Sequence, residues 1–94
     1  MKKKRTRTAP RTVERIQVGA RMEKTIVKVL KGLAEYLDLS LGDLLEGITL
    51  HALEGKAPFS KETLAQIDRL KTIYRLELTA KDSHQLVEEK HARR

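Results

Sequence analysis

The segment Arg15-Ile16-Gln17-Val18-Gly19-Ala20-Arg21-Met22 alternates strictly between apolar side chains and polar or small ones. Successive side chains of an extended chain point to opposite sides, so this alternation predicts a half-buried β-strand over about residues 14–22. A lone strand leaves its backbone N–H and C=O groups unpaired. Because no second strand is predicted anywhere in the chain, we expect the same strand of a second copy to supply the partner.

The net charge of +7 is distributed unevenly along the 94 residues. Residues 1–15 contain one acidic side chain, Glu14, and a cluster of basic ones: Lys2, Lys3, Lys4, Arg5, Arg7, Arg11 and Arg15. Residues 16–94 are close to neutral. A basic stretch without apolar periodicity predicts a flexible arm over residues 1–13 that binds polyanions, most often nucleic acid. A solubilising terminus and a nuclear-import signal are the alternatives.

The composition excludes several classes of protein. The chain is long enough for one domain with a small core. It has no cysteine, so disulfides and thiolate metal sites are excluded. Aromatic residues make up 3% of the chain, which argues against single-strand binding by base stacking. We find no apolar run of membrane-spanning length and no export signal, so we expect a cytoplasmic protein.

Apolar residues at spacings of three and four predict helices after the strand. The first runs from Glu23 to about Leu37, and the second from Leu41 to about Leu53 with Ser40 as its N-cap and Gly55 after its end. Further helices are predicted over about residues 61–75 and, with Thr79 and Asp82 as a capping box, over about residues 80–90.

A strand, a helix, a tight turn with serine and a second helix resemble the ribbon-helix-helix family of DNA-binding regulators. The resemblance covers about residues 14–55 and rests on the alternating segment and on Ser40-Leu41-Gly42-Asp43-Leu44-Leu45. It implies a mainly α fold: a dimer with an intermolecular two-stranded antiparallel ribbon, here followed by a helical C-terminal extension over residues 56–94.

The resemblance also implies that the ribbon enters the major groove of double-stranded DNA. Its base-contacting positions fall on Gln17, Gly19 and Arg21, with Arg15 as a further candidate. Arginine can donate a bidentate fork to guanine, and glutamine can pair with adenine. Gly19 brings no base-reading side chain.

Phosphate contacts are expected at the start of the second helix, where backbone N–H groups and the helix dipole favour anions. These positions are Ser40, Leu41 and Gly42, with Lys24 and the basic residues of the arm as additional contacts. One strand and two short helices cannot bury their apolar residues alone, so folding and dimerisation should be coupled. The expected dimer core is Ile16, Val18, Ala20, Met22, Leu30, Leu33, Leu45 and Ile48.

The sequence thus predicts a dimeric DNA-binding protein, a transcriptional or plasmid-maintenance regulator that inserts a β-ribbon into the major groove and could assemble further on DNA. The alternative is an antitoxin-like protein whose residues 60–94 bind a partner protein, and an RNA-binding or architectural protein is a third interpretation. No catalytic motif is present, so we expect no enzyme and no cofactor. The histidines His51, His84 and His91 lack the spacing of a metal site, so we expect no metal.

Overall fold

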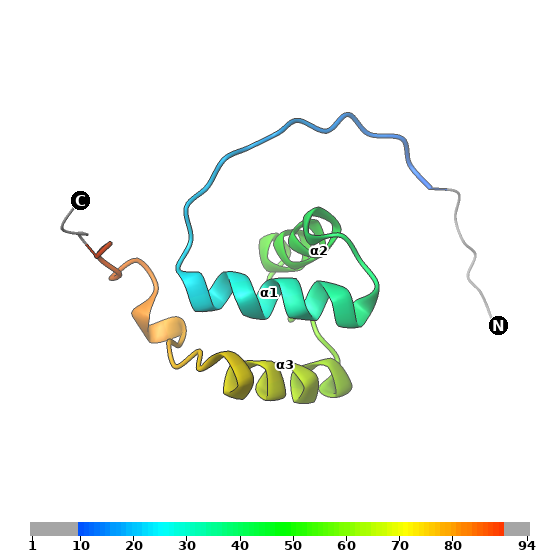
Figure 1. The fold of residues 1–94 in the computed structure, drawn as a ribbon. Helices are drawn as coiled ribbons and strands as arrows, with labels where there is room; N and C mark the ends of the chain where they lie inside the picture. Colours follow the sequence, from blue (N-terminus) through cyan, green and yellow to red (C-terminus); the bar gives the residue numbers. More distant parts are fainter. Residues whose placement is uncertain (1–9, 90–94) are drawn as a thin grey trace.

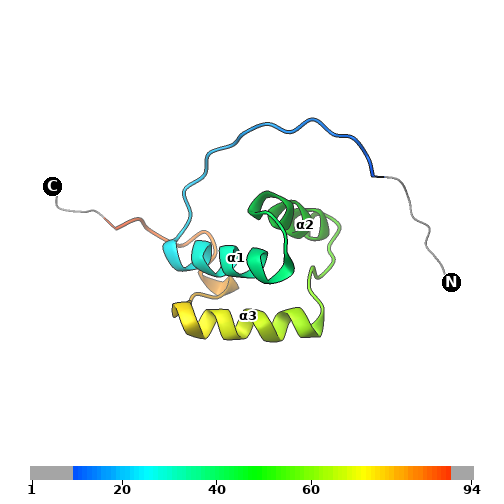
Figure 2. The same ribbon diagram turned by 45° about the vertical axis from the view of Figure 1, so that its right-hand side comes forward.

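The computed structural model describes residues 10–89 and consists there of three α-helices and one short 3-10 turn. Helix α1 spans Lys24–Leu37, α2 spans Leu41–Leu53, α3 spans Lys61–Tyr74, and the turn η1 spans Ala80–Asp82. Figures 1 and 2 show α2 and α3 on opposite sides of α1. The predictions of the first three helices are confirmed within one residue at each end.

Each helix begins at a side chain that accepts a hydrogen bond from a free backbone N–H of the first turn. Ser40 Oγ accepts from the Asp43 N–H (3.1 Å) and Ser60 Oγ accepts from the Thr63 N–H (3.2 Å). At α1 the cap is Glu23, whose carboxylate accepts from the Ile26 N–H (2.9 Å). These bonds satisfy donors that a helix cannot satisfy internally.

The three helices also end alike, in a left-handed residue followed by a backbone bond that closes the last turn. The left-handed residues are Asp38 (φ 62°), Gly55 (φ 73°) and Arg75 (φ 58°). The residue after each donates its N–H to the carbonyl five positions back, as when the Lys56 N–H bonds to the His51 carbonyl (2.8 Å). This pattern confirms the predicted role of Gly55 and explains why the chain turns sharply at each end.

The core is small and centres on α1. Its buried residues are Val29, Leu33 and Ala34 of α1, Leu44 of α2 and Leu70 of α3. Leu33 is 2% exposed, and complete burial of a leucine contributes about 1.5–3 kcal/mol. Because α3 supplies Leu70 to this core, it belongs to the same packed body as α1 and α2.

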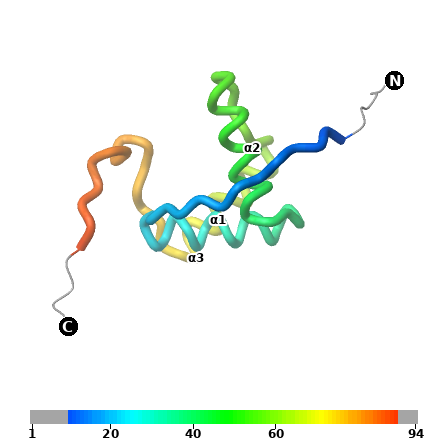
Figure 3. The backbone as a smooth tube through the Cα atoms, turned by 90° about the horizontal axis from the view of Figure 1, so that it is seen from above, coloured from blue at the N-terminus to red at the C-terminus, as the bar shows by residue number. Residues whose placement is uncertain are grey.

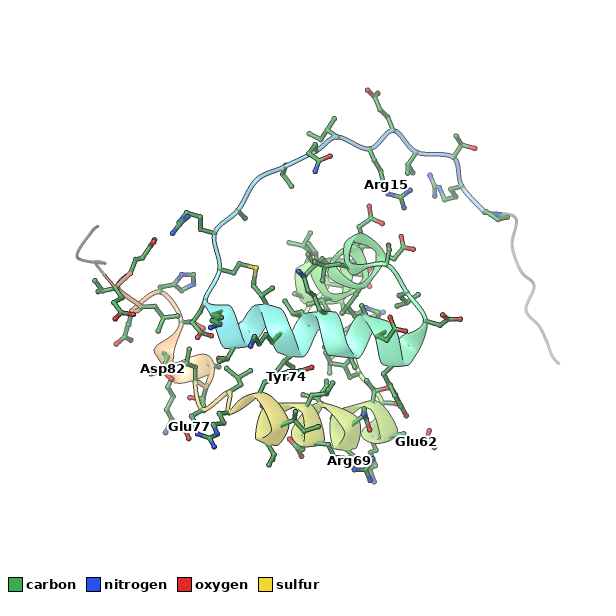
Figure 4. All side chains as sticks on the ribbon, in the orientation of Figure 1. Arg15, Glu62, Arg69, Tyr74, Glu77 and Asp82 are labelled. Atoms are coloured by element: carbon green, nitrogen blue, oxygen red, sulfur yellow. The ribbon has the colours of Figure 1, made fainter. Side chains whose placement is uncertain are left out.

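Helix α3 approaches α1 closely at Gly32. A Cβ atom on Gly32 would lie 2.9 Å from Leu70 Cδ2 and 3.6 Å from the Tyr74 ring. The ring of Tyr74, which lies between the two helices in Figure 4, also receives the Lys28 ammonium 5.9 Å from its centroid. The lack of a side chain at Gly32 therefore lets the two helices lie this close. Glycine is unfavourable within a helix, and the packing of α3 on α1 offsets this cost.

The predicted ribbon-helix-helix fold is wrong, because the structure has no β-strand between residues 10 and 89. Residues 10–22, which we call the extended segment, are extended but unpaired (Figure 1). No backbone hydrogen bond joins them to another part of residues 10–89. A strand requires the N–H and C=O groups of a neighbour, and no other segment of the described residues supplies them.

The predicted fourth helix is also wrong. The capping box of Thr79 and Asp82 forms, but it starts only the 3-10 turn η1, and residues 85–89 have no regular structure. His84 has a φ of 65°, which an α-helix cannot accommodate. The physical reason is that this segment has few apolar side chains to pack, and Leu86 and Val87 are both exposed.

We predict that Gly32→Ala and Gly47→Ala have different effects on stability. Both replace a mid-helix glycine, which should stabilise a helix by about 1 kcal/mol. A Cβ on Gly47 meets nothing within 4 Å, so this variant should show the full gain, whereas Leu70 must move to admit alanine at position 32. Urea unfolding measures both free energies. Equal gains would show that the contact of α1 with α3 at Gly32 is not tight.

Candidate nucleic-acid interface

The extended segment lies on the outside of the molecule. Figures 1 and 3 show it leaving the start of α1 and running past α2, on the side of α1 opposite α3. Its residues are all exposed, and the apolar side chains of the predicted strand are among them: Ile16 is 78% and Val18 77% exposed. Such a row of exposed apolar side chains is typical of an interaction surface.

Arg15, near the middle of the extended segment, contacts α2. Its Nε and Nη2 atoms donate to the two carboxylate oxygens of Glu46, each at 2.9 Å, and Nη2 lies 3.6 Å from Asp43 Oδ1. Figure 4 shows the Arg15 side chain pointing from the segment toward α2. Both carboxylates belong to one face of α2 because they are three residues apart.

Arg21, close to the end of the segment that joins α1, contacts the C-terminal part of the chain. Its Nε donates to Glu88 Oε1 at 3.2 Å, and its Nη2 donates to Glu88 Oε2. The two side chains are 82% and 64% exposed. The two arginines predicted to contact bases therefore each form a fork with a glutamate of this same chain.

These ion pairs shift the pKa values of their members in the direction that favours the charged forms. The hydrogen bond from Arg15 and then its positive charge lower the pKa of Glu46, and Glu46 in turn raises the pKa of Arg15. The hydrogen bond from Arg21 and then its charge lower the pKa of Glu88 in the same way. Both pairs are open to solvent, so each contributes little to global stability and weakens as salt is added.

The other predicted base-contacting positions are free of such contacts. Gln17 is exposed, and a Cβ placed on Gly19 would meet nothing within 4 Å. The absence of a side chain at position 19 is therefore not required by packing within the chain. Lys24, predicted to contact phosphate, is the exposed first residue of α1 and lies three positions after Arg21.

The start of α2 is open in the way that a phosphate contact requires. Ser40 Oγ accepts from the Asp43 N–H, which leaves the N–H groups of Leu41 and Gly42 at the helix terminus. The Asp43 carboxylate lies near Arg15, and this places Arg15 beside the first turn of α2. The structure thus brings Arg15 together with the predicted phosphate positions, whereas Arg21 lies with Glu88.

The predicted dimer core separates into two groups. Leu33 is buried, Leu30 and Ile48 pack partly buried against the same core, and Leu45 is half-buried, so these four are covered to differing extents within one chain. The other group, on the extended segment, is exposed: Ile16, Val18, Ala20 and Met22. One chain therefore covers four members of the predicted dimer core by itself, with α2 and α3 packed on α1.

The basic arm falls mostly outside the part of the chain that the structure describes. Lys2, Lys3, Lys4, Arg5 and Arg7 lie among residues 1–9, and Arg11 is exposed at the start of the extended segment. Their predicted contacts to phosphate stay predictions.

Sequence reasoning missed the acidic partners of the two arginines. The spacing of Asp43 and Glu46 does place two carboxylates on one face of α2, and this signal could have indicated a binding position for a cation. No comparable signal exists for Glu88, because 67 residues separate it from Arg21.

Within residues 10–89 we find no helix whose length and apolar character would let it cross a membrane. That same range contains no group of three histidine or acidic side chains arranged to hold a metal ion. His51 instead bonds through Nδ1 to the Gly47 carbonyl oxygen of its own helix (2.7 Å).

Comparisons of the chain with models of protein families, with curated proteins and with solved structures gave no match. The resemblance over residues 14–55 therefore rests on the sequence pattern alone.

We predict that Arg15→Ala raises the pKa of Glu46 toward the ordinary glutamate value of about 4.3. In the intact protein the pKa of Glu46 lies below that value. The contact is therefore complete when the pH is above the ordinary glutamate pKa, and it is lost as the pH falls through the lowered pKa of Glu46. Titration of the side-chain carboxyl carbons by NMR measures the shift. An unchanged pKa for Glu46 would show that Arg15 does not hold the extended segment against α2 in solution.

Proposed function

We propose that this chain is a dimeric DNA-binding protein of the regulatory kind, in which the extended segment lies against double-stranded DNA. The observation that supports this most is the exposed course of residues 10–22 directly after the basic stretch of residues 1–9. Residues 1–22 are one continuous basic stretch of the sequence, and residues 10–22 of it lie outside the packed helices. Extended basic arms of this type enter the grooves of DNA in other proteins.

The side chains on the segment suit the two tasks of such an interface. Lysine and arginine contacts to phosphates give affinity without sequence preference and release counterions. Arg21 and Gln17 have the donors and acceptors that read base edges, and Lys24 and the free N–H groups of Leu41 and Gly42 suit phosphates. The proposal assigns specificity to Arg21 and Gln17, with Arg15 as a third reader.

Selection from random duplex DNA, with the stoichiometry of the complex measured by light scattering, tests the proposal. Recovery of a defined site bound by two copies supports a regulator. Tight binding without any preference would favour an architectural or RNA-binding protein instead. A failure to bind duplex DNA at low salt would refute the proposal.

We predict that Arg21→Ala weakens binding to the selected site by about 1–3 kcal/mol and relaxes the base preference at one position. Arg69→Ala is the matched control. Arg69 is an exposed arginine of α3 that bonds to Gln66, and it lies on the side of α3 that faces away from α1 (Figure 4). Fluorescence anisotropy with the selected duplex and with single-base variants measures both effects. Equal losses of affinity in the two variants would show that Arg21 acts only through its positive charge and contradict its role in base recognition.

We predict further that dimerisation depends on the apolar side chains of the extended segment. Ile16→Asp should shift the protein toward monomer, because burial of an isoleucine contributes about 1.5–3 kcal/mol and a buried aspartate is costly. Ile73→Asp on α3 is the control, since Ile73 is also exposed (66%) but lies outside the proposed interface. Sedimentation equilibrium measures the dissociation constants. A monomeric parent protein, or an unchanged dimer in Ile16→Asp, would contradict the prediction.

A further inference from the structure

The contact between Arg21 and Glu88 uses the same donors that a nucleic acid would need. The Nε and Nη2 atoms of Arg21 face the two oxygens of one carboxylate. Arginine recognises phosphates and the guanine edge by this same pair of parallel N–H bonds. Arg21 therefore cannot form the fork with Glu88 and with DNA at the same time.

The part of the chain that contains Glu88 is suited to compete with DNA. Residues 82–89, which we call the acidic segment, contain Asp82, Glu88 and Glu89 and lie between Lys81 and Lys90. After the turn η1 the segment passes the start of α1, where the extended segment enters the helix (Figures 1 and 2). At Arg21 the Glu88 carboxylate provides the negative charge that a DNA phosphate would provide.

The fold keeps the acidic segment close to Arg21. The Arg75 cap ends α3 near the start of α1, and the capping box of Thr79 and Asp82 fixes the turn that leads toward Arg21. A ligand tethered in this way has a high effective concentration even when each contact is weak. It remains displaceable, because both side chains are largely exposed to solvent.

We propose that the acidic segment competes with DNA within the same chain. Glu88 accepts the hydrogen bonds of Arg21 until a nucleic acid displaces Glu88. The inference rests on the proposed function, because it assigns a nucleic acid as the ligand that competes for Arg21. It adds that the C-terminal part of the chain limits affinity. A change that removed the charge of Glu88, or moved the acidic segment away, would strengthen binding.

The test compares Glu88→Gln with Glu89→Gln in the full chain. Both variants remove one negative charge from neighbouring exposed positions, so any general effect of net charge is the same. Glu89 forms no ion pair among the residues that the structure describes. A mixed-sequence DNA duplex is the probe, with binding measured by fluorescence anisotropy at low and at moderate salt.

We expect Glu88→Gln to bind DNA about two- to fivefold more tightly than Glu89→Gln at low salt, the range that an exposed ion pair allows. The difference should shrink as salt is added, and it should disappear when both substitutions are made in an Arg21→Ala background. Equal affinities of the two variants would overturn the competition and leave DNA binding intact. No binding by the parent protein or by either variant would overturn the proposed function and the competition together.

A second measurement follows the competition directly. The pKa of the Glu88 carboxyl, lowered by Arg21 in the free protein, should rise when the duplex is added, as it should in Arg21→Ala without DNA. Carboxyl NMR titration measures both. A Glu88 pKa that stays low in the DNA complex would show that Arg21 keeps its contact with Glu88, and this would overturn the proposal even if the affinities differed.

Discussion

The packing of α1 against both of its neighbours is the interaction on which the rest of the molecule depends. Leu33 and Ala34 are buried because α2 covers one side of α1 and α3 the other, and Gly32 lets Leu70 approach the helix. Neither α2 nor α3 would have a buried side chain without α1 between them. With only five buried side chains among the described residues, this core is small, and each contact in it matters.

This arrangement also determines where the two ends of the chain meet. The extended segment ends at the start of α1, and α3 returns the chain to the same end of α1 (Figures 1 and 2). The turn η1 then directs residues 83–89 past that point, which brings Glu88 to Arg21. A contact between residues so distant in sequence is therefore a consequence of α1 and α3 lying side by side.

The extended segment has the sequence pattern of a β-strand but lacks, among the described residues, the hydrogen-bonding partner that a strand requires. Its alternation of apolar and polar residues predicted a half-buried β-strand, and in the described part of the chain the segment is neither paired nor buried. The alternation did not predict whether the backbone would find hydrogen-bonding partners, because these must come from elsewhere. Within residues 10–89 of this chain they do not, and what holds the segment is a pair of arginine forks to Glu46 and Glu88.

The sequence by itself determined the three helices, the serine caps of α2 and α3 and the left-handed glycine after α2, because propensity, periodicity and capping act over a few neighbouring residues. It also determined the basic charge at the N-terminus. Only the tertiary structure decided that α3 packs on α1 of its own chain, that residues 85–89 are not a helix, and that Arg15 and Arg21 have acidic partners. These outcomes depend on which surfaces meet, and a close approach such as that of Leu70 to Gly32 joins residues that local patterns cannot relate.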